Sequence, residues 1–188
     1  MALNRAYLRD VNQLDSWKSR GISQNVKCVF LSHQKEDKDI CHKIADYLIG
    51  AGIDVYFDEY DLDLKIANQT QDSKAVTKAI LKGVNYSTHM LCVVSPNTLD
   101  SKWVPFEIGF GYDKTQLGVL LLKGIKKEQL PDYIRAVDSI VPSIWHLNYF
   151  ISNIENSTVE LLENRHIIKT WNDGHHPLIN FMESINIV

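Results

Sequence analysis

VKCVFL, at residues 26–31, is a short run of β-branched and apolar residues, which is typical of a strand buried on both faces of a sheet. A helix is predicted after it, because Glu36 begins an acid-rich turn and apolar residues then recur on one face up to about Gly50. Strands that alternate with helices in this way predict an α/β fold, a flavodoxin-like, doubly wound parallel sheet of five strands. The remaining strands are expected at 53–57, 90–94, 118–122 and near Ile140 or Ile144, and the remaining helices at 74–82 and 103–112.

Two flanking regions lie outside this alternation. Residues 4–20 carry apolar residues at helical spacing and predict an N-terminal helix, which a polar linker follows. Helical stretches are expected within 148–169, and a last helix is expected to begin at Pro177. We therefore expect three parts, with an N-terminal helix and linker at 1–25, the α/β domain at 26–148 and a C-terminal helical extension at 149–188.

The composition is that of an ordinary globular protein and narrows the choice of partners. The 188 residues carry a formal net charge of −3, whereas a general nucleic-acid binder carries a basic excess. No apolar run reaches the about 18 to 20 residues of a membrane span, and the N-terminus lacks the apolar segment of a secretory signal, so we expect a cytoplasmic protein. Cys28, Cys41 and Cys92 are widely spaced without a CxxC motif, and we expect buried, reduced thiols.

We expect no metal site in this chain. His175 and His176 are adjacent, so their side chains point in different directions, and no further ligand lies at a suitable spacing. A calcium-binding EF-hand loop beginning at Asp58 would need glycine at its sixth position and glutamate at its twelfth, where the chain has Asp63 and Gln69.

In a doubly wound sheet the functional site lies outside the carboxyl ends of the strands. After the first strand the chain reads Ser32-His33-Gln34-Lys35. It lacks the acid pair of a receiver domain, the phosphate loop of a flavodoxin and the GxGxxG motif of a dinucleotide-binding domain. What remains is either a solvated loop or a polar turn whose one cation, Lys35, meets one phosphate.

Acidic residues follow the second strand, with four carboxylates between Asp58 and Asp63. This segment is either an exposed acidic loop or a place where one carboxylate accepts hydrogen bonds from the ribose or amide of a ligand.

After the third strand, Trp103 and Glu107 are four residues apart at the start of a predicted helix and therefore share one face. A carboxylate beside an aromatic side chain suits a sugar or a nicotinamide ring, although such a pair also occurs for structural reasons alone. Gly109 and Gly111 are unfavourable inside a helix, by about 1 kcal/mol each, and indicate close packing there.

These segments together resemble the TIR (Toll/interleukin-1 receptor) domain family. VFLSH at 29–33 is similar to the first conserved box of the family, and VYFD at 55–58 is similar to its second strand, which leads into the BB loop. SPN at 95–97 is followed by the pattern S-x-W-x-x-x-E, which ends at Trp103 and Glu107 and resembles the signature of enzymatic TIR domains. The resemblance covers residues 26–145, and three boxes in the right order make it fairly specific.

Enzymatic TIR domains cleave NAD⁺ at the nicotinamide–ribose bond, and the resemblance implies the same activity here. It implies that Glu107 is the catalytic residue, that Trp103 is the aromatic residue one turn before it, and that Gln34 and Lys35 lie near the phosphates. The full substrate-binding set that it implies is Phe30, Ser32, His33, Gln34, Lys35, Asp58, Asp63 and Trp103. NAD⁺ is then the substrate, and no separate cofactor is expected.

The turn after the first strand departs from the family pattern, because His33-Gln34-Lys35 replaces the common Tyr-Arg-Arg. Weak phosphate binding by a single copy follows, and a homo-oligomer built through TIR–TIR contacts is expected to complete the site. The chain resembles the standalone TIR subunit of bacterial Thoeris anti-phage systems, whose nucleotide product signals to a separate effector. A non-enzymatic TIR adaptor and a nucleoside deoxyribosyltransferase are the alternatives.

Overall fold

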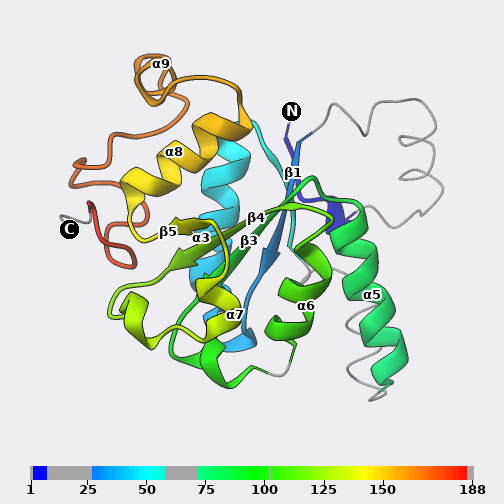
Figure 1. The fold of residues 1–188 in the computed structure, drawn as a ribbon. Coiled ribbons are helices and arrows are strands. Elements are labelled where there is room, and N and C mark those ends of the chain that lie inside the picture. The colour runs from blue at the N-terminus through cyan, green and yellow to red at the C-terminus, as the bar shows by residue number, and fades with distance from the viewer. Residues whose placement is uncertain (1, 8–26, 58–71, 102, 186–188) are drawn as a thin grey trace.

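The computed structural model describes residues 2–7, 27–57, 72–101 and 103–185 (Figure 1). Its centre is a five-stranded sheet in the order β2-β1-β3-β4-β5, in which every neighbouring pair of strands is parallel. This order confirms the predicted flavodoxin-like sheet. The strands are β1 (Cys28–Ser32), β2 (Asp54–Tyr56), β3 (His89–Val94), β4 (Gln116–Leu121) and β5 (Ser139–Val141).

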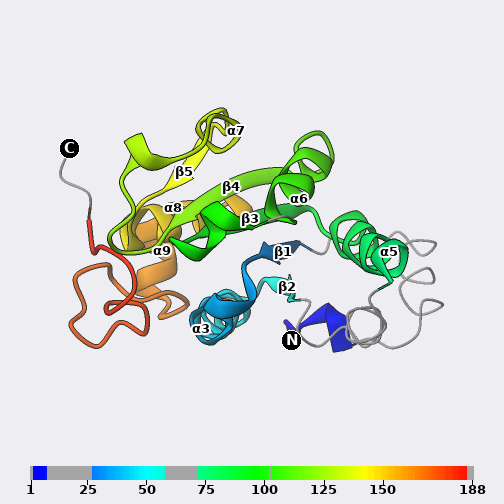
Figure 2. The ribbon, with the colours of Figure 1, turned by 90° about the horizontal axis from the view of Figure 1, so that it is seen from below.

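Helices cover both faces of the sheet (Figure 2). One face packs against α3 and α8, and the other packs against α5, α6 and α7. The α-helices are α3 (Lys38–Gly50), α5 (Ser73–Asn85), α6 (Val104–Gly111), α7 (Asp132–Arg135), α8 (Ile144–Ile154) and α9 (Val159–Asn164). Short 3₁₀ turns are η1 (Arg5–Tyr7), η2 (Lys35–Asp37), η4 (Asn97–Asp100) and η5 (Lys127–Gln129).

The strands are apolar without alternation because each side of the sheet carries its own core. In β1, Val29 and Leu31 belong to the core under α3 and α8, whereas Cys28 and Phe30 belong to the core under α5 and α6. A parallel sheet covered on both faces requires this pattern. All three cysteines are buried and free, as the sequence predicts. Within the described residues, no helix is long and apolar enough to cross a membrane.

Glycines allow two helices to approach the sheet closely. A Cβ atom built on Gly83 of α5 would lie 2.6 Å from the Phe30 ring, and one built on Gly111 of α6 would lie 2.5 Å from the Met90 sulfur. The predicted close packing is therefore confirmed at Gly111. It is wrong at Gly109, where a Cβ atom would meet nothing within 4 Å.

The chain after β5 packs on the same domain. The helical stretches expected within 148–169 are present as α8 and α9. The helix expected from Pro177 is wrong, because residues 177–181 form turns and Glu183 forms an isolated bridge with Ser143. Leu178 and Met182 are buried in the core, but the carbonyls of Phe181 and Glu183 accept hydrogen bonds from the backbone of Lys123 and Ile144. Carbonyls engaged in this way do not form a helical ladder.

The N-terminal flank is described only at residues 2–7, which form an isolated bridge and the turn η1. The rest of the helix predicted at 4–20 and the linker at 21–25 lie outside the described residues.

Candidate active site

Glu107 lies in the first turn of α6, at the carboxyl edge of the sheet. The helix begins there because Ser101 Oγ accepts a hydrogen bond from the Val104 backbone N–H at 3.2 Å and because Pro105, in the first turn, lacks the N–H that a helix start leaves unpaired. An acid in a first turn is favoured by the helix dipole. Glu107 is nevertheless buried, with 5% of its surface exposed.

Ser32, the last residue of β1, donates a hydrogen bond to the Glu107 carboxylate, with 2.5 Å between Oγ and Oε2. Ser32 is 1% exposed, so its hydroxyl is shielded from water and bonds to the carboxylate instead. A hydrogen bond to a charged acceptor is stronger than one between neutral groups and fixes its orientation. The end of β1 and the first turn of α6 thus bring together two residues that lie 75 positions apart in the chain.

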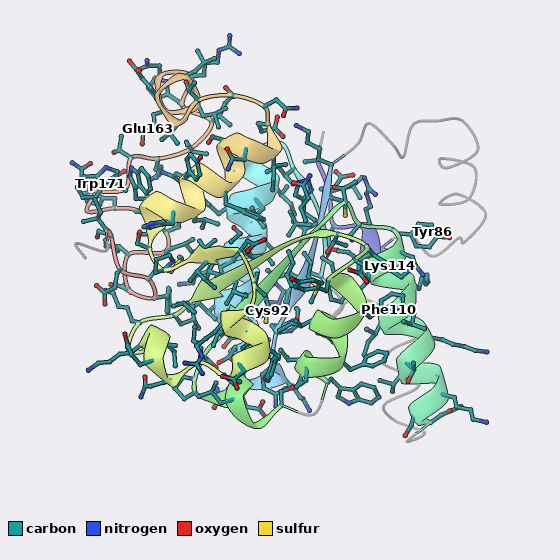
Figure 3. The ribbon with its side chains drawn as sticks, viewed as in Figure 1. Tyr86, Cys92, Phe110, Lys114, Glu163 and Trp171 are labelled. Carbon is teal, nitrogen blue, oxygen red and sulfur yellow. The ribbon has the colours of Figure 1, made fainter. Side chains whose placement is uncertain are left out.

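Cys92 lies beside this pair, with its sulfur 3.9 Å from Ser32 Oγ. Burial and the nearby charge of Glu107 raise the pKa of the Cys92 thiol to about 12. The thiol therefore stays protonated at neutral pH and is unsuited to act as a nucleophile. Cys92 is fully buried and is labelled near the centre of Figure 3, whereas Phe110 lies between α6 and α5 in this view.

Trp103 stands one turn before Glu107 and is 38% exposed. Its ring meets Phe106 edge-on, with ring centroids 6.1 Å apart, and Phe106 stacks on Phe110 at 6.4 Å. Lys114 Nζ lies 4.9 Å from the centroid of the Phe110 ring. Sequence reasoning singled out Trp103 alone, although the spacing of three and four residues between the aromatic side chains marks one helical face.

Asp37 ties together the loops that follow β1 and β3. Ser95 Oγ donates to Asp37 Oδ2 at 2.5 Å, and Asn97 Nδ2 donates to Asp37 Oδ1 at 2.8 Å. The backbone N–H of Asn97 also donates to Ser95 Oγ at 3.0 Å. This cluster fixes the chain that leads into α6, whereas in the sequence Asp37 is only one acid of the acid-rich turn that begins at Glu36.

The turn after β1 places three polar side chains at the same edge. His33 Nδ1 lies 3.2 Å from the Leu31 carbonyl oxygen, and its ring lies 4.8 Å from the Phe57 ring, centroid to centroid. Gln34 precedes η2, and its carbonyl accepts a hydrogen bond from the Asp37 backbone. Lys35 is exposed. An exposed ammonium group at this edge is free of the core and able to meet an anion.

Comparison with known proteins adds the decisive observation, because residues 29–142 match the TIR domain family over more than half of the chain. The chain belongs to the TIR domain family. The matched region begins within β1 and ends after β5, so it contains residues of all five strands.

Relatives of this TIR domain are distant. A protein of Bacteroides thetaiotaomicron named 2' cyclic ADP-D-ribose synthase BtTIR is 28% identical over 80 residues, which are 42% of this chain and 25% of that protein. The chain thus matches about a quarter of the length of this curated relative.

Two solved structures are also similar. The TIR domain of the Toll-related receptor TRR-2 of Hydra magnipapillata is 17% identical, with a TM-score of 0.50 over 68% of this chain and 98% of that one. A metazoan TIR-STING receptor from C. gigas, solved in complex with 2',3'-cGAMP, is 24% identical, with a TM-score of 0.48 over 68% of this chain and 38% of that one. At 17% identity, the likeness to the Hydra domain shows the fold alone.

The residues of the expected substrate-binding set differ in their exposure to solvent. Phe30 is 1% exposed, and its ring packs on Tyr56 with centroids 6.0 Å apart, which leaves it no surface for a ligand. Ser32 contacts Glu107 and is likewise closed to solvent. Asp58 and Asp63 lie outside the described residues.

Proposed function

We propose that this TIR domain cleaves NAD⁺ at the nicotinamide–ribose bond, with Glu107 as its catalytic residue. The observation that carries the proposal is a buried carboxylate, held by the Ser32 hydroxyl at 2.5 Å, one turn after a half-exposed tryptophan. The curated relative named as a 2' cyclic ADP-D-ribose synthase supports the same class of chemistry.

The chemistry requires a carboxylate in a site of low polarity. Loss of nicotinamide leaves a ribose with oxocarbenium character, and a carboxylate stabilises this positive charge more strongly in a buried site than in water. We assign Glu107 to this role. The exposed Trp103 ring is suited to stack on a flat base, and Lys35 is suited to meet a phosphate.

The fate of the ribose cation decides the product. Capture by water gives ADP-ribose, whereas capture by an adenine nitrogen or a ribose hydroxyl gives a cyclic ADP-ribose isomer. Exclusion of water favours the second route. We propose one of these two products.

A single copy offers one exposed cation to two phosphates in the turn after β1, namely Lys35. We therefore propose that TIR–TIR contacts between copies of this chain complete the phosphate site. On the resemblance to the TIR subunit of Thoeris systems, we propose that a cytoplasmic nucleotide signal in bacterial anti-phage defence, received by a separate effector, is the biological output.

The test is incubation of concentrated protein with NAD⁺, followed by chromatographic identification of nicotinamide and of the ribose-containing product. The proposal predicts nicotinamide release and either ADP-ribose or a cyclic isomer, together with the loss of both in Glu107→Ala. Intact NAD⁺ under conditions in which the protein self-associates would refute it, and so would a Glu107→Ala variant as active as the wild type.

An exposed aromatic surface favours one second candidate, a TIR adaptor that acts by binding other TIR domains. Trp103, Phe106 and Tyr112 are 38%, 38% and 53% exposed on and just after α6. Self-association that depends on these side chains, without turnover of NAD⁺, would favour the adaptor.

A further inference from the structure

Residues 2–7, here called the N-terminal strap, lie beside β2 at the outer edge of the sheet (Figure 2). The backbone N–H of Val55 donates to the Leu3 carbonyl at 3.0 Å, and Asn4 forms a parallel bridge with Val55. The strap therefore continues the hydrogen-bonding pattern of the sheet past its last strand.

A buried ion pair anchors the strap. Arg5 Nε lies 2.8 Å from Asp54 Oδ2, and the two side chains are 3% and 8% exposed. Arg5 Nη1 also donates to the Tyr86 carbonyl, at 2.8 Å, just after α5. Breaking such a pair leaves an uncompensated buried charge, so the strap is held firmly in place.

Asn4 uses this anchored position to hold Phe57, the residue that follows β2. Its side-chain oxygen accepts a hydrogen bond from the Phe57 backbone N–H at 3.1 Å, and its Nδ2 donates to the Phe57 carbonyl at 3.3 Å. One buried side-chain amide therefore pairs with both backbone polar groups of Phe57, its N–H and its C=O. Asn4 itself is 6% exposed.

Phe57 connects Asn4 to the candidate active site, because it contacts both Asn4 and His33. Its ring lies 4.8 Å from the ring of His33, in the turn after β1, and 4.8 Å from the ring of His42 in α3. Phe57 is 1% exposed, so its ring is confined between these neighbours. Any displacement of the Phe57 backbone has to move a ring that packs directly on His33.

We propose that the strap positions the His33 side of the active site, with Asn4 as a positioning residue that acts through Phe57. The inference rests on the proposed function, because His33 belongs to the NAD⁺-binding set that the TIR resemblance implies. It also assigns a role to a segment that lies outside the matched TIR region, which begins at residue 29. The strap thereby acts on substrate binding in addition to stabilising the fold.

The test uses Asn4→Ala in the full chain, with Asn148→Ala as its matched control. Asn148 is also a buried asparagine: it accepts from the Tyr47 hydroxyl at 2.8 Å and donates to the Lys169 carbonyl at 2.7 Å. Because its hydrogen bonds go to Tyr47 and Lys169 and not to Phe57, its removal is expected to reproduce the loss of stability without removing a hydrogen bond of Phe57. Urea denaturation establishes that both variants are folded and similarly destabilised.

Two measurements then separate positioning from stability. The ring resonances of His33, assigned by their loss in His33→Gln, should shift in Asn4→Ala and stay in place in Asn148→Ala. The KM for NAD⁺ should rise about fivefold in Asn4→Ala, the effect expected if misplacement of His33 removes one hydrogen bond to the substrate, while kcat changes less than twofold. In Asn148→Ala both constants should stay at their wild-type values.

The outcomes are distinguishable. Unshifted His33 resonances in Asn4→Ala overturn the inference whatever the activity. Shifted resonances with an unchanged KM overturn it as well, because the strap then has no effect on substrate. If the wild type leaves NAD⁺ intact, the proposed function fails. The His33 resonances alone then decide whether the strap fixes the position of the His33 ring.

Discussion

Ser32→Ala tests whether the geometry around Glu107 matters for the reaction. The substitution removes only the hydroxyl that donates to Glu107 Oε2 at 2.5 Å. A hydrogen bond to a charged group contributes about 1.5–3 kcal/mol. If all of it is expressed in the transition state, at about 1.36 kcal/mol per tenfold change in rate, kcat/KM for NAD⁺ falls roughly 10- to 150-fold.

The matched control is Ser87→Ala. Ser87 is also buried, and its Oγ donates to the Gly83 carbonyl at 2.9 Å, but it lies at the amino end of β3, away from Glu107. Its loss should cost about 1 kcal/mol of folding free energy and leave kcat/KM unchanged.

The assay is steady-state release of nicotinamide at several NAD⁺ concentrations, with urea denaturation of each variant to confirm folding. A folded Ser32→Ala protein whose kcat/KM stays within threefold of the wild type would refute the reasoning, because the carboxylate would then need no hydroxyl to orient it. An equal loss in Ser87→Ala would refute it too, since stability alone would explain both variants.

Three further predictions concern stability and are checked by urea denaturation. Arg5→Met leaves Asp54 buried without its cation and should cost about 3–5 kcal/mol, and a loss below about 1 kcal/mol would contradict the buried ion pair. Gly83→Ala should cost about 1–3 kcal/mol of folding free energy, because its Cβ atom would lie 2.6 Å from an aromatic ring. Gly109→Ala has open space around it and should stabilise α6 by about 1 kcal/mol. A Gly109→Ala protein that is less stable than Gly83→Ala would contradict this packing. Burial lowers the pKa of His176 from 6.5 to about 4, so the unfolded chain takes up a proton at a higher pH than the folded chain does. Acidification from pH 7 to pH 5 should therefore reduce the free energy of unfolding by about 1–2 kcal/mol. A His176→Gln variant whose stability depends on pH as that of the wild type does would contradict this.

The sheet was predictable because its evidence is local. Each strand is a continuous apolar run between polar turns, and each helix carries its own stripe and start signals, so residues 26–31 already indicate a strand covered on both faces. The position of Trp103 and Glu107 at the carboxyl edge follows from the same reasoning, because it needs only the order of the elements.

The features that sequence reasoning missed depend on contacts across the chain. Asp37 and Ser95 are 58 positions apart, and nothing near either residue indicates that they meet. The helix predicted from Pro177 is absent for the same reason, because backbone N–H groups from distant parts of the chain donate hydrogen bonds to carbonyls of this segment. Gly109 and Gly111 have the same local signal, and only the position of Met90 on β3 distinguishes them. The aromatic row at Phe106 is different, since its helical spacing was visible in the sequence.

The most direct test of the central claim is the rate of nicotinamide release from NAD⁺ by the wild type and by Glu107→Gln at equal protein concentration. Glutamine keeps the size of the side chain and removes its charge, and Glu160→Gln on the exposed surface of α9 is the control. We predict release by the wild type and by Glu160→Gln and its loss in Glu107→Gln. Equal rates in all three proteins would contradict the assignment of Glu107 as the catalytic residue.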